Sequence, residues 1–143
     1  MPTKIEWLRT KNNSLRGYSE GESINPWGWG CWGPQGSGEH ARRCSYCFAA
    51  RLARRNLRDC PDCRAFVPHW HPEELQKVYH WKRPRRVFIG SMTDPFGAWY
   101  EPWVAQNQWC ALLFAVVQNP QHIYYLLTKQ PERIVETLSP IAN

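Results

Sequence analysis

The feature that most constrains the fold is an alternation of short apolar runs with helical patterns in the second half of the chain. Residues 85–91 read RRVFIGS and residues 122–128 read HIYYLLT, two β-rich runs bounded by polar or small residues. Between them, Pro102 can open a helix that runs to an Asn-Pro pair at Asn119. Another helix is predicted to begin within 131–138. Strands that alternate with helices predict parallel βαβ units, which bind ligands at the carboxyl ends of their strands.

The rest of the chain extends this α/β fold class in one domain. A length of 143 residues with 43% hydrophobic residues suits a single core. Residues 1–24 contain many turn-forming residues and no sustained period, so we expect an irregular N-terminal extension ahead of a folded unit at 25–143. From Phe48 onward, apolar residues recur at helical spacing with arginines on the other side, which predicts an amphipathic helix.

Five of the six cysteines lie close together: Cys31, Cys44, Cys47, Cys60 and Cys63. The N-terminus has no apolar signal region, and the longest apolar run, at 109–117, is short of the roughly 18 residues of a membrane span. The chain is therefore predicted to be cytoplasmic. Thiols stay reduced in that compartment, which favours metal ligands over disulfides.

Spacing alone leaves two kinds of metal site open. The paired cysteines, spaced C-x2-C-x12-C-x2-C from Cys44 to Cys63, match a zinc site of four thiolates and leave Cys31 without a role. Alternatively, Cys31, Cys44 and Cys47 hold three irons of a cubane cluster and leave the fourth iron open to an exogenous ligand. Two C-x-x-C pairs are the stronger signal, so spacing by itself favours zinc.

The formal charge of +6 suggests polyanionic partners. No known nucleic-acid motif is present, so binding of nucleic acid through a basic face is the alternative that accompanies the zinc interpretation. The positive residues concentrate in two groups: Arg42, Arg43, Arg51, Arg54, Arg55, Arg58 and Arg64, then Lys82, Arg83, Arg85 and Arg86.

Six sequence blocks, in order along nearly the whole chain, carry a resemblance to a known family. They read TKIEW at 3–7, NPWGWGC at 25–31, CSYCFAARLARR at 44–55, FVPHWHPEEL at 66–75, WKRPRRVFIGSMTDPF at 81–96 and LLTKQPERI at 126–134. In these blocks the chain resembles the phage-associated three-Cys-motif proteins, which are placed in the radical SAM superfamily. The resemblance reverses the order of the two metal interpretations and favours the cluster.

The resemblance implies that Cys31, Cys44 and Cys47 bind a 4Fe-4S cluster, and that S-adenosylmethionine occupies the open iron through its amino and carboxylate groups. Reductive cleavage would give a 5′-deoxyadenosyl radical that abstracts hydrogen from an unknown substrate. Tyr46 holds the position that commonly contacts the adenine in superfamily members.

Polar residues at strand ends complete the site that the resemblance implies. Ser91, Thr93 and Asp94 follow the strand at 85–91, where they are expected to hold the methionine end or the ribose. Lys129 follows the strand at 122–128, where it either faces the same mouth or lies on the surface.

The implied fold is a partial (β/α) barrel, radical SAM-like and incomplete. The chain supplies about three βα units, the N-terminal half of such a barrel, and acts as a radical SAM enzyme or as an inactive fragment of one in a phage or mobile element. The apolar strand edge after residue 122 would need cover, so we expect a second chain or a C-terminal half against it.

Cys60 and Cys63 remain outside the cluster. They are a candidate second metal site, either zinc shared with His69 or His71 or part of an auxiliary cluster, and the alternative is a thiol pair that stabilises a surface turn. Cys110 lies in the apolar helix and is predicted to be a core thiol, whereas His40 and His80 are expected on the surface.

Overall fold

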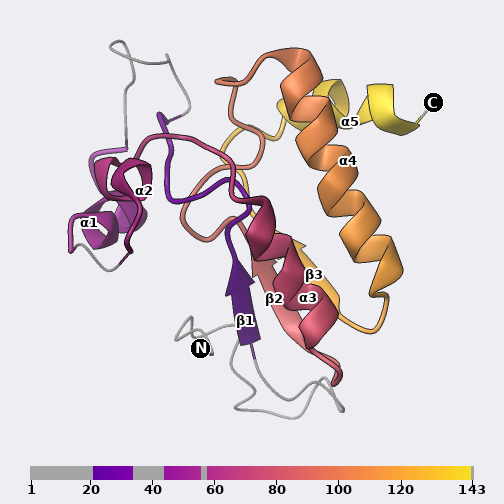
Figure 1. Cartoon of the computed structure of the whole chain (residues 1–143). Helices are drawn as coiled ribbons and strands as arrows, with labels where there is room; N and C mark the ends of the chain where they lie inside the picture. Colours follow the sequence, from indigo (N-terminus) through magenta and orange to yellow (C-terminus); the bar gives the residue numbers. More distant parts are fainter. Residues whose placement is uncertain (1–20, 34–43, 56–57, 143) are drawn as a thin grey trace.

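The computed structural model describes residues 21–33, 44–55 and 58–142, and Figure 1 shows the arrangement of their helices and strands. The predicted surface histidine His40 and residues 1–20 of the predicted extension lie outside these ranges. The elements, in chain order, are β1 (Gly21–Ile24), α1 (Phe48–Ala53), α2 (Pro61–Ala65), the 3-10 helix η3 (Pro72–Leu75), α3 (Gln76–His80), β2 (Arg86–Ile89), α4 (Pro102–Gln118), β3 (Ile123–Leu126) and α5 (Arg133–Ala142).

The three strands form one parallel sheet in the order β1-β2-β3. Ile24 pairs with Ile89, and Ile89 pairs with Leu126, so the carboxyl ends of all three strands lie at one edge. Every residue of the central strand β2 is buried. The predicted α/β class with a parallel sheet is confirmed, and the segments after the strands start from a common edge.

Strand β1 lies in a segment that the sequence assigned to the irregular extension. The sequence did not predict this strand because it contains polar residues, and the partners of these residues lie far along the chain. Glu22 is buried and forms an ion pair with Arg85 at 2.8 Å, while the Ser23 hydroxyl lies 2.6 Å from the Ser91 hydroxyl. A strand of four residues held by such partners has no local signal in its own sequence.

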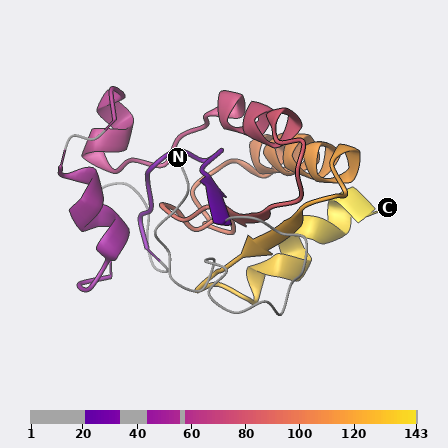
Figure 2. The ribbon, with the colours of Figure 1, turned by 90° about the horizontal axis from the view of Figure 1, so that it is seen from below.

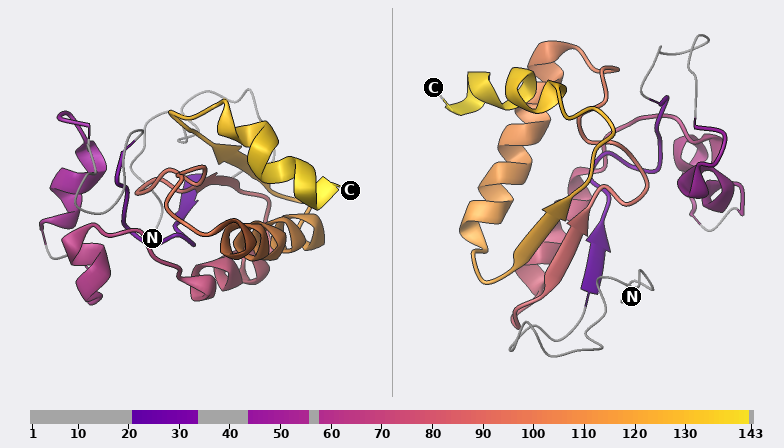
Figure 3. Two further views of the ribbon diagram at one scale, coloured as in Figure 1. Left: turned by 90° about the horizontal axis from the view of Figure 1, so that it is seen from above. Right: turned by 180° about the vertical axis from the view of Figure 1, so that it is seen from behind.

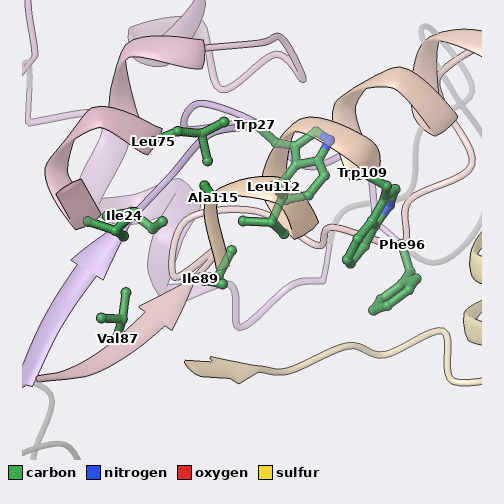
Figure 4. Close-up of a cluster of buried hydrophobic side chains, with 10 residues drawn as sticks. Ile24, Trp27, Leu75, Val87, Ile89, Phe96, Trp109, Leu112 and Ala115 are labelled. Carbon is green, nitrogen blue, oxygen red and sulfur yellow. The ribbon is translucent and has the colours of Figure 1, made fainter. Parts of the chain in front are cut away.

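The main core lies between the sheet and the helices α3 and α4, which cover the same face (Figure 2). Ile24, Val87 and Ile89 extend from the strands toward this core, as the close-up in Figure 4 shows. Trp27 is almost fully buried, and its indole N–H donates to the Gln108 side chain at 2.8 Å. Its ring also contacts Trp109, at 5.1 Å between ring centroids, so the segment after β1 is fixed against α4.

Helix α4 matches its predicted range but is buried along one side only. Trp109, Leu112 and Ala115 are buried, whereas Phe114 and Val117 are 64% and 70% exposed. The expectation of a core thiol at Cys110 is therefore wrong, because its position on the helix turns it toward solvent. Helix α5 packs beside α4 (Figure 3). None of the helices in the described ranges combines the length and apolarity needed to cross a bilayer.

Helices α1 and α2 form a second, smaller packing unit near the carboxyl end of β1 (Figure 1). Its buried centre consists of Ala50, Ala53 and Phe66, and Trp29 packs against it. Cys31 and Cys47 also lie against this cluster, so the small unit borders the edge at which the strands end.

Candidate functional site

A pocket of about 240 Å³ lies at the carboxyl ends of β2 and β3. Phe88 faces it, because alternation along β2 turns this side chain away from the core side that holds Val87 and Ile89. The lining residues are Cys31, Gly33, Cys44, Cys47, Ala49, Phe66, Phe88, Gly90, Ser91, Met92, Thr93, Asp94, Leu127, Thr128 and Lys129. The pocket thus joins the mouth of the sheet to the small helical unit.

All three cysteines expected to bind a cluster line this pocket. Cys47 is the N-cap of α1, and its sulfur accepts the Ala50 N–H at 3.4 Å. A turn joins it to Cys44, whose carbonyl accepts the Cys47 N–H at 3.0 Å. Cys31 arrives from the loop after β1 and accepts the Gly33 N–H at 3.3 Å through its sulfur. Two separate segments, one with Cys31 and one with Cys44 and Cys47, therefore place three thiols around one cavity.

The Cys31 thiol is partly buried. Burial raises its pKa to about 11, and the negative charges of Asp94 and Cys47 act in the same direction. A thiol in such surroundings keeps its proton unless a positive charge lies close to the sulfur.

Ser91, Thr93 and Asp94 line the pocket as predicted, but each also bonds within the protein. The Ser91 hydroxyl interacts with the Asn25 amide, and the Thr93 hydroxyl donates to the Gly30 carbonyl. Asp94 accepts three hydrogen bonds: from the Phe96 N–H at 3.0 Å, the Thr128 hydroxyl at 2.7 Å and the Lys129 N–H at 3.0 Å. This carboxylate ties the end of β2 to the end of β3 and so fixes the shape of the mouth.

Lys129 fits both of its predicted positions, because it lines the pocket and is also exposed to solvent. Its ammonium donates to the Cys44 sulfur at 3.2 Å and to the Tyr46 hydroxyl at 2.9 Å, and it lies 4.2 Å from the centroid of the Tyr46 ring. The hydrogen bonds to Tyr46 and Cys44 raise the pKa of this lysine, which keeps it charged. Tyr46 itself is 70% exposed and reaches the pocket only through Lys129.

A second group of potential metal ligands lies outside the pocket: Cys60, Cys63, His69 and His71. One ligand atom of each lies within 4.8 Å of all the others, so the group could hold a metal ion such as zinc. Cys44 and Cys47 are not among these four residues, and the two C-x-x-C pairs therefore lie at different sites. Sequence reasoning offered His69 and His71, singly or as a pair, as metal partners of these cysteines, and the structure brings both of them to the cysteines.

The local fold explains why these four side chains meet. Cys60 is the N-cap of the short helix α2, which carries Cys63 one turn later. Phe66 ends the helix in the left-handed region at φ 59°, with its N–H bonded to the Cys63 carbonyl and the Val67 N–H bonded to the Asp62 carbonyl. The chain then turns back past the cysteines.

The segment beyond this turn carries both histidines. His69 and His71 face the cysteines together, while Trp70 between them packs on Trp27 at 5.3 Å between ring centroids. A His-x-His pair six residues after a C-x-x-C pair was the available sequence signal. This signal becomes decisive only with the left-handed turn at Phe66, which the sequence did not establish.

Comparison with protein families places the chain in one of them. The family model described as protein of unknown function (DUF5131) matches residues 2–143, so the chain belongs to this family. Neither the curated proteins nor the solved structures contain a match to the chain.

Proposed function

We propose that the pocket binds a 4Fe-4S cluster through Cys31, Cys44 and Cys47, and that the protein reductively cleaves S-adenosylmethionine for radical chemistry on a further substrate. The observation that carries this proposal is the convergence of these three cysteines on one pocket at the carboxyl edge of a parallel sheet. That edge is where α/β folds bind their ligands.

The donor set fits such a cluster. Each thiolate of a cubane binds a different iron, so the ligands surround a volume and do not converge on one point, as three cysteines around a pocket do. Three protein ligands leave one iron open. The apolar side chains of Phe66 and Phe88 face the same space and would limit contact with water.

The remaining residues suit a charged, polar cosubstrate beside the cluster. The Lys129 ammonium is positioned at Cys44 and would offset the negative charge of the thiolates. Asp94 and Thr128 hold the mouth open at a fixed width, and the hydroxyls of Ser91 and Thr93 line it. A bound cluster would supply one electron, received from an external low-potential donor, to break the C5′–S bond of S-adenosylmethionine and release methionine.

The arrangement of the sheet also supports a partial barrel. Helices α3 and α4 cover one face of the sheet, and the pocket lies on the face that carries Phe88. A barrel has its helices outside and its side chains or ligands inside, so this asymmetry is the one expected of barrel units.

The test is metal analysis of protein purified without oxygen. We expect about four irons and four sulfides per chain, as a cubane requires, together with formation of 5′-deoxyadenosine when a low-potential reductant and S-adenosylmethionine are added. Cys31→Ser should lose the iron and this activity. Cys110→Ser, which changes an exposed cysteine away from the pocket, is the matched control and should keep both.

Two outcomes would overturn the proposal. One is protein that holds zinc but no sulfide while remaining folded. The other is an iron content that stays the same in Cys31→Ser, because the ligand assignment would then be wrong.

A further inference from the structure

We infer that Cys60, Cys63, His69 and His71 bind one Zn²⁺ in a closed tetrahedral site, and that this ion fixes the loop that carries Cys31 to the pocket. The site is separate from the pocket, and zinc binding there requires neither iron nor S-adenosylmethionine. The geometry of the ligand atoms, the partners of the histidines and the contacts of the loop support this inference.

The ligand atoms have the spacing of a tetrahedral zinc site. Zn–S bonds of about 2.3 Å and Zn–N bonds of about 2.0–2.1 Å, at the tetrahedral angle, place a sulfur and a nitrogen about 3.6 Å apart. The Cys60 sulfur lies 3.6 Å from Nε2 of His69, and the Cys63 sulfur lies 3.2 Å and 3.5 Å from Nε2 of His69 and His71. An ion at the centre would therefore need only small movements of the four side chains.

Both histidines already present the correct nitrogen. Nδ1 of His69 lies 2.6 Å from the Val67 carbonyl oxygen, which can only accept, so Nδ1 carries the proton and Nε2 has a free lone pair. Nδ1 of His71 pairs in the same way with the Glu73 carboxylate. An outward N–H bonded to a carbonyl or carboxylate is the usual support of a histidine that binds zinc.

Charge and ligand number favour a structural ion. Two thiolates and two neutral imidazoles balance the charge of Zn²⁺, which suits a site where Cys63 is fully buried. Four protein ligands complete a tetrahedron and leave no position for water or substrate, as in structural zinc sites.

The loop after β1 packs directly on this site. The backbone N–H of His71 donates to the Pro26 carbonyl at 2.5 Å. Gly28 adopts φ +64°, and a Cβ there would lie 2.4 Å from the His69 ring. The loop and the two histidines therefore fit together without room for a side chain between them.

The same loop is tied to the pocket on its other side. The Gly30 N–H donates to the Met92 carbonyl at 3.2 Å, and its carbonyl accepts from the Thr93 hydroxyl. Cys31 is the next residue and lines the pocket. A metal that orders the segment with His69 and His71 thus also orders the side of the β1 loop that packs on it. The other side of this loop is held by its hydrogen bonds to the residues after β2.

Zinc content gives the first test. Wild-type protein purified without added metal should contain about one zinc per chain, and Cys60→Ser and His71→Ala should retain less than about a tenth of it, because loss of one ligand weakens the site strongly. Cys44→Ser and His80→Ala are the matched controls, since they change a pocket cysteine and an exposed histidine. They should keep their zinc, and Cys44→Ser should lose only iron.

Zinc that stays at one per chain in Cys60→Ser and His71→Ala would overturn the assignment, as would equal loss from Cys44→Ser. If the ligand variants do not fold, wild-type protein stripped of zinc can be titrated with Co²⁺. A tetrahedral site with two thiolates should then give intense visible absorption and saturate at about one Co²⁺ per chain. Weak octahedral absorption would contradict the site.

The loop is tested by hydrogen exchange in the Cys44→Ser background, where a cluster cannot contribute. Removal of zinc should speed exchange in residues 27–31 by about tenfold or more, because the contacts that protect the loop depend on the ordered histidines. Unchanged exchange would show that zinc does not fix the loop. A protein that binds zinc but never iron would refute the proposed function and leave this inference intact.

Discussion

The two proposed metal sites differ in how their ligand side chains are brought together. In the Cys60–His71 region, four ligands come from one stretch of twelve residues and converge within 4.8 Å. In the pocket, Cys31 comes from one segment and Cys44 and Cys47 from another, and they surround a cavity. The first arrangement suits a closed structural site, and the second leaves space for a reacting molecule. A C-x-x-C pair alone does not distinguish these roles.

The segment after each C-x-x-C pair distinguishes the two roles. Cys47 caps α1, and that helix supplies no further ligand. After Cys63, the left-handed residue Phe66 reverses the chain and returns two histidines to the cysteines. The surroundings differ as well, because the histidines are held by a carbonyl and a carboxylate, whereas Cys44 has the ammonium of Lys129 beside it.

The largest effect is expected from Gly30→Ala, which acts where the two regions meet. A Cβ on Gly30 would lie 2.2 Å from the carbonyl carbon of Val67, and this backbone cannot move without displacing the histidine segment or the loop to Cys31. We expect a loss of about 3 kcal/mol in unfolding free energy, measured by denaturant unfolding, and reduced retention of both zinc and iron.

Gly97→Ala is the matched control for this substitution. Its Cβ would meet the side chain of the partly exposed Trp99, which can rotate aside, so zinc and iron should remain bound. If Gly30→Ala keeps full stability and both metals, the two regions are not coupled through this loop.

Strong local signals allowed the sequence to predict much of this fold. Strands β2 and β3 are apolar runs, and α4 has Pro102 at its start and Asn119 at its end, so these elements could be predicted. Strand β1 could not, because its buried Glu22 is satisfied by Arg85, more than sixty residues away. The order of the predicted strands and helices could therefore be read from the sequence, but the ion pair between Glu22 and Arg85 could not.

The candidate sites, too, could be predicted only where a signal is present in the sequence itself. The three pocket cysteines were expected together because a family resemblance linked them, and their spacing alone favoured a different grouping. The pairing of His69 and His71 with Cys60 and Cys63 depends on the left-handed turn at Phe66, which a bulky residue rarely adopts. The sequence therefore offered both histidines as candidate ligands but could not show that the chain returns them to the cysteines.

An intermediate effect, confined to the pocket that holds Cys31, Cys44 and Cys47, is expected from Asp94→Asn. The amide oxygen can keep the bonds from the Phe96 N–H and the Thr128 hydroxyl, so the bond from the Lys129 N–H is lost and the new NH2 group is placed against that N–H. The expected cost is about 1–3 kcal/mol in unfolding free energy, with weaker iron retention and unchanged zinc. Asp59→Asn, at an exposed position, is the control for the change of charge. Zinc loss in Asp94→Asn would contradict the separation of the two regions.

The smallest effect is expected from Glu73→Gln, and it should be confined to the Cys60–His71 region. The Glu73 side chain is 63% exposed, so the Glu73→Gln change should leave the unfolding transition of zinc-free protein nearly unchanged. The glutamine oxygen can still accept from Nδ1 of His71, but without its charge it makes the ring a weaker ligand, and zinc affinity should fall about tenfold in competition with a chromogenic chelator. Glu132→Gln, at another exposed carboxylate, should have no effect on affinity.

Equal affinity in Glu73→Gln and wild type would mean that the carboxylate only orients His71. A tenfold loss with iron content unchanged would instead show that this carboxylate strengthens the closed site while the open site is supported by residues of its own.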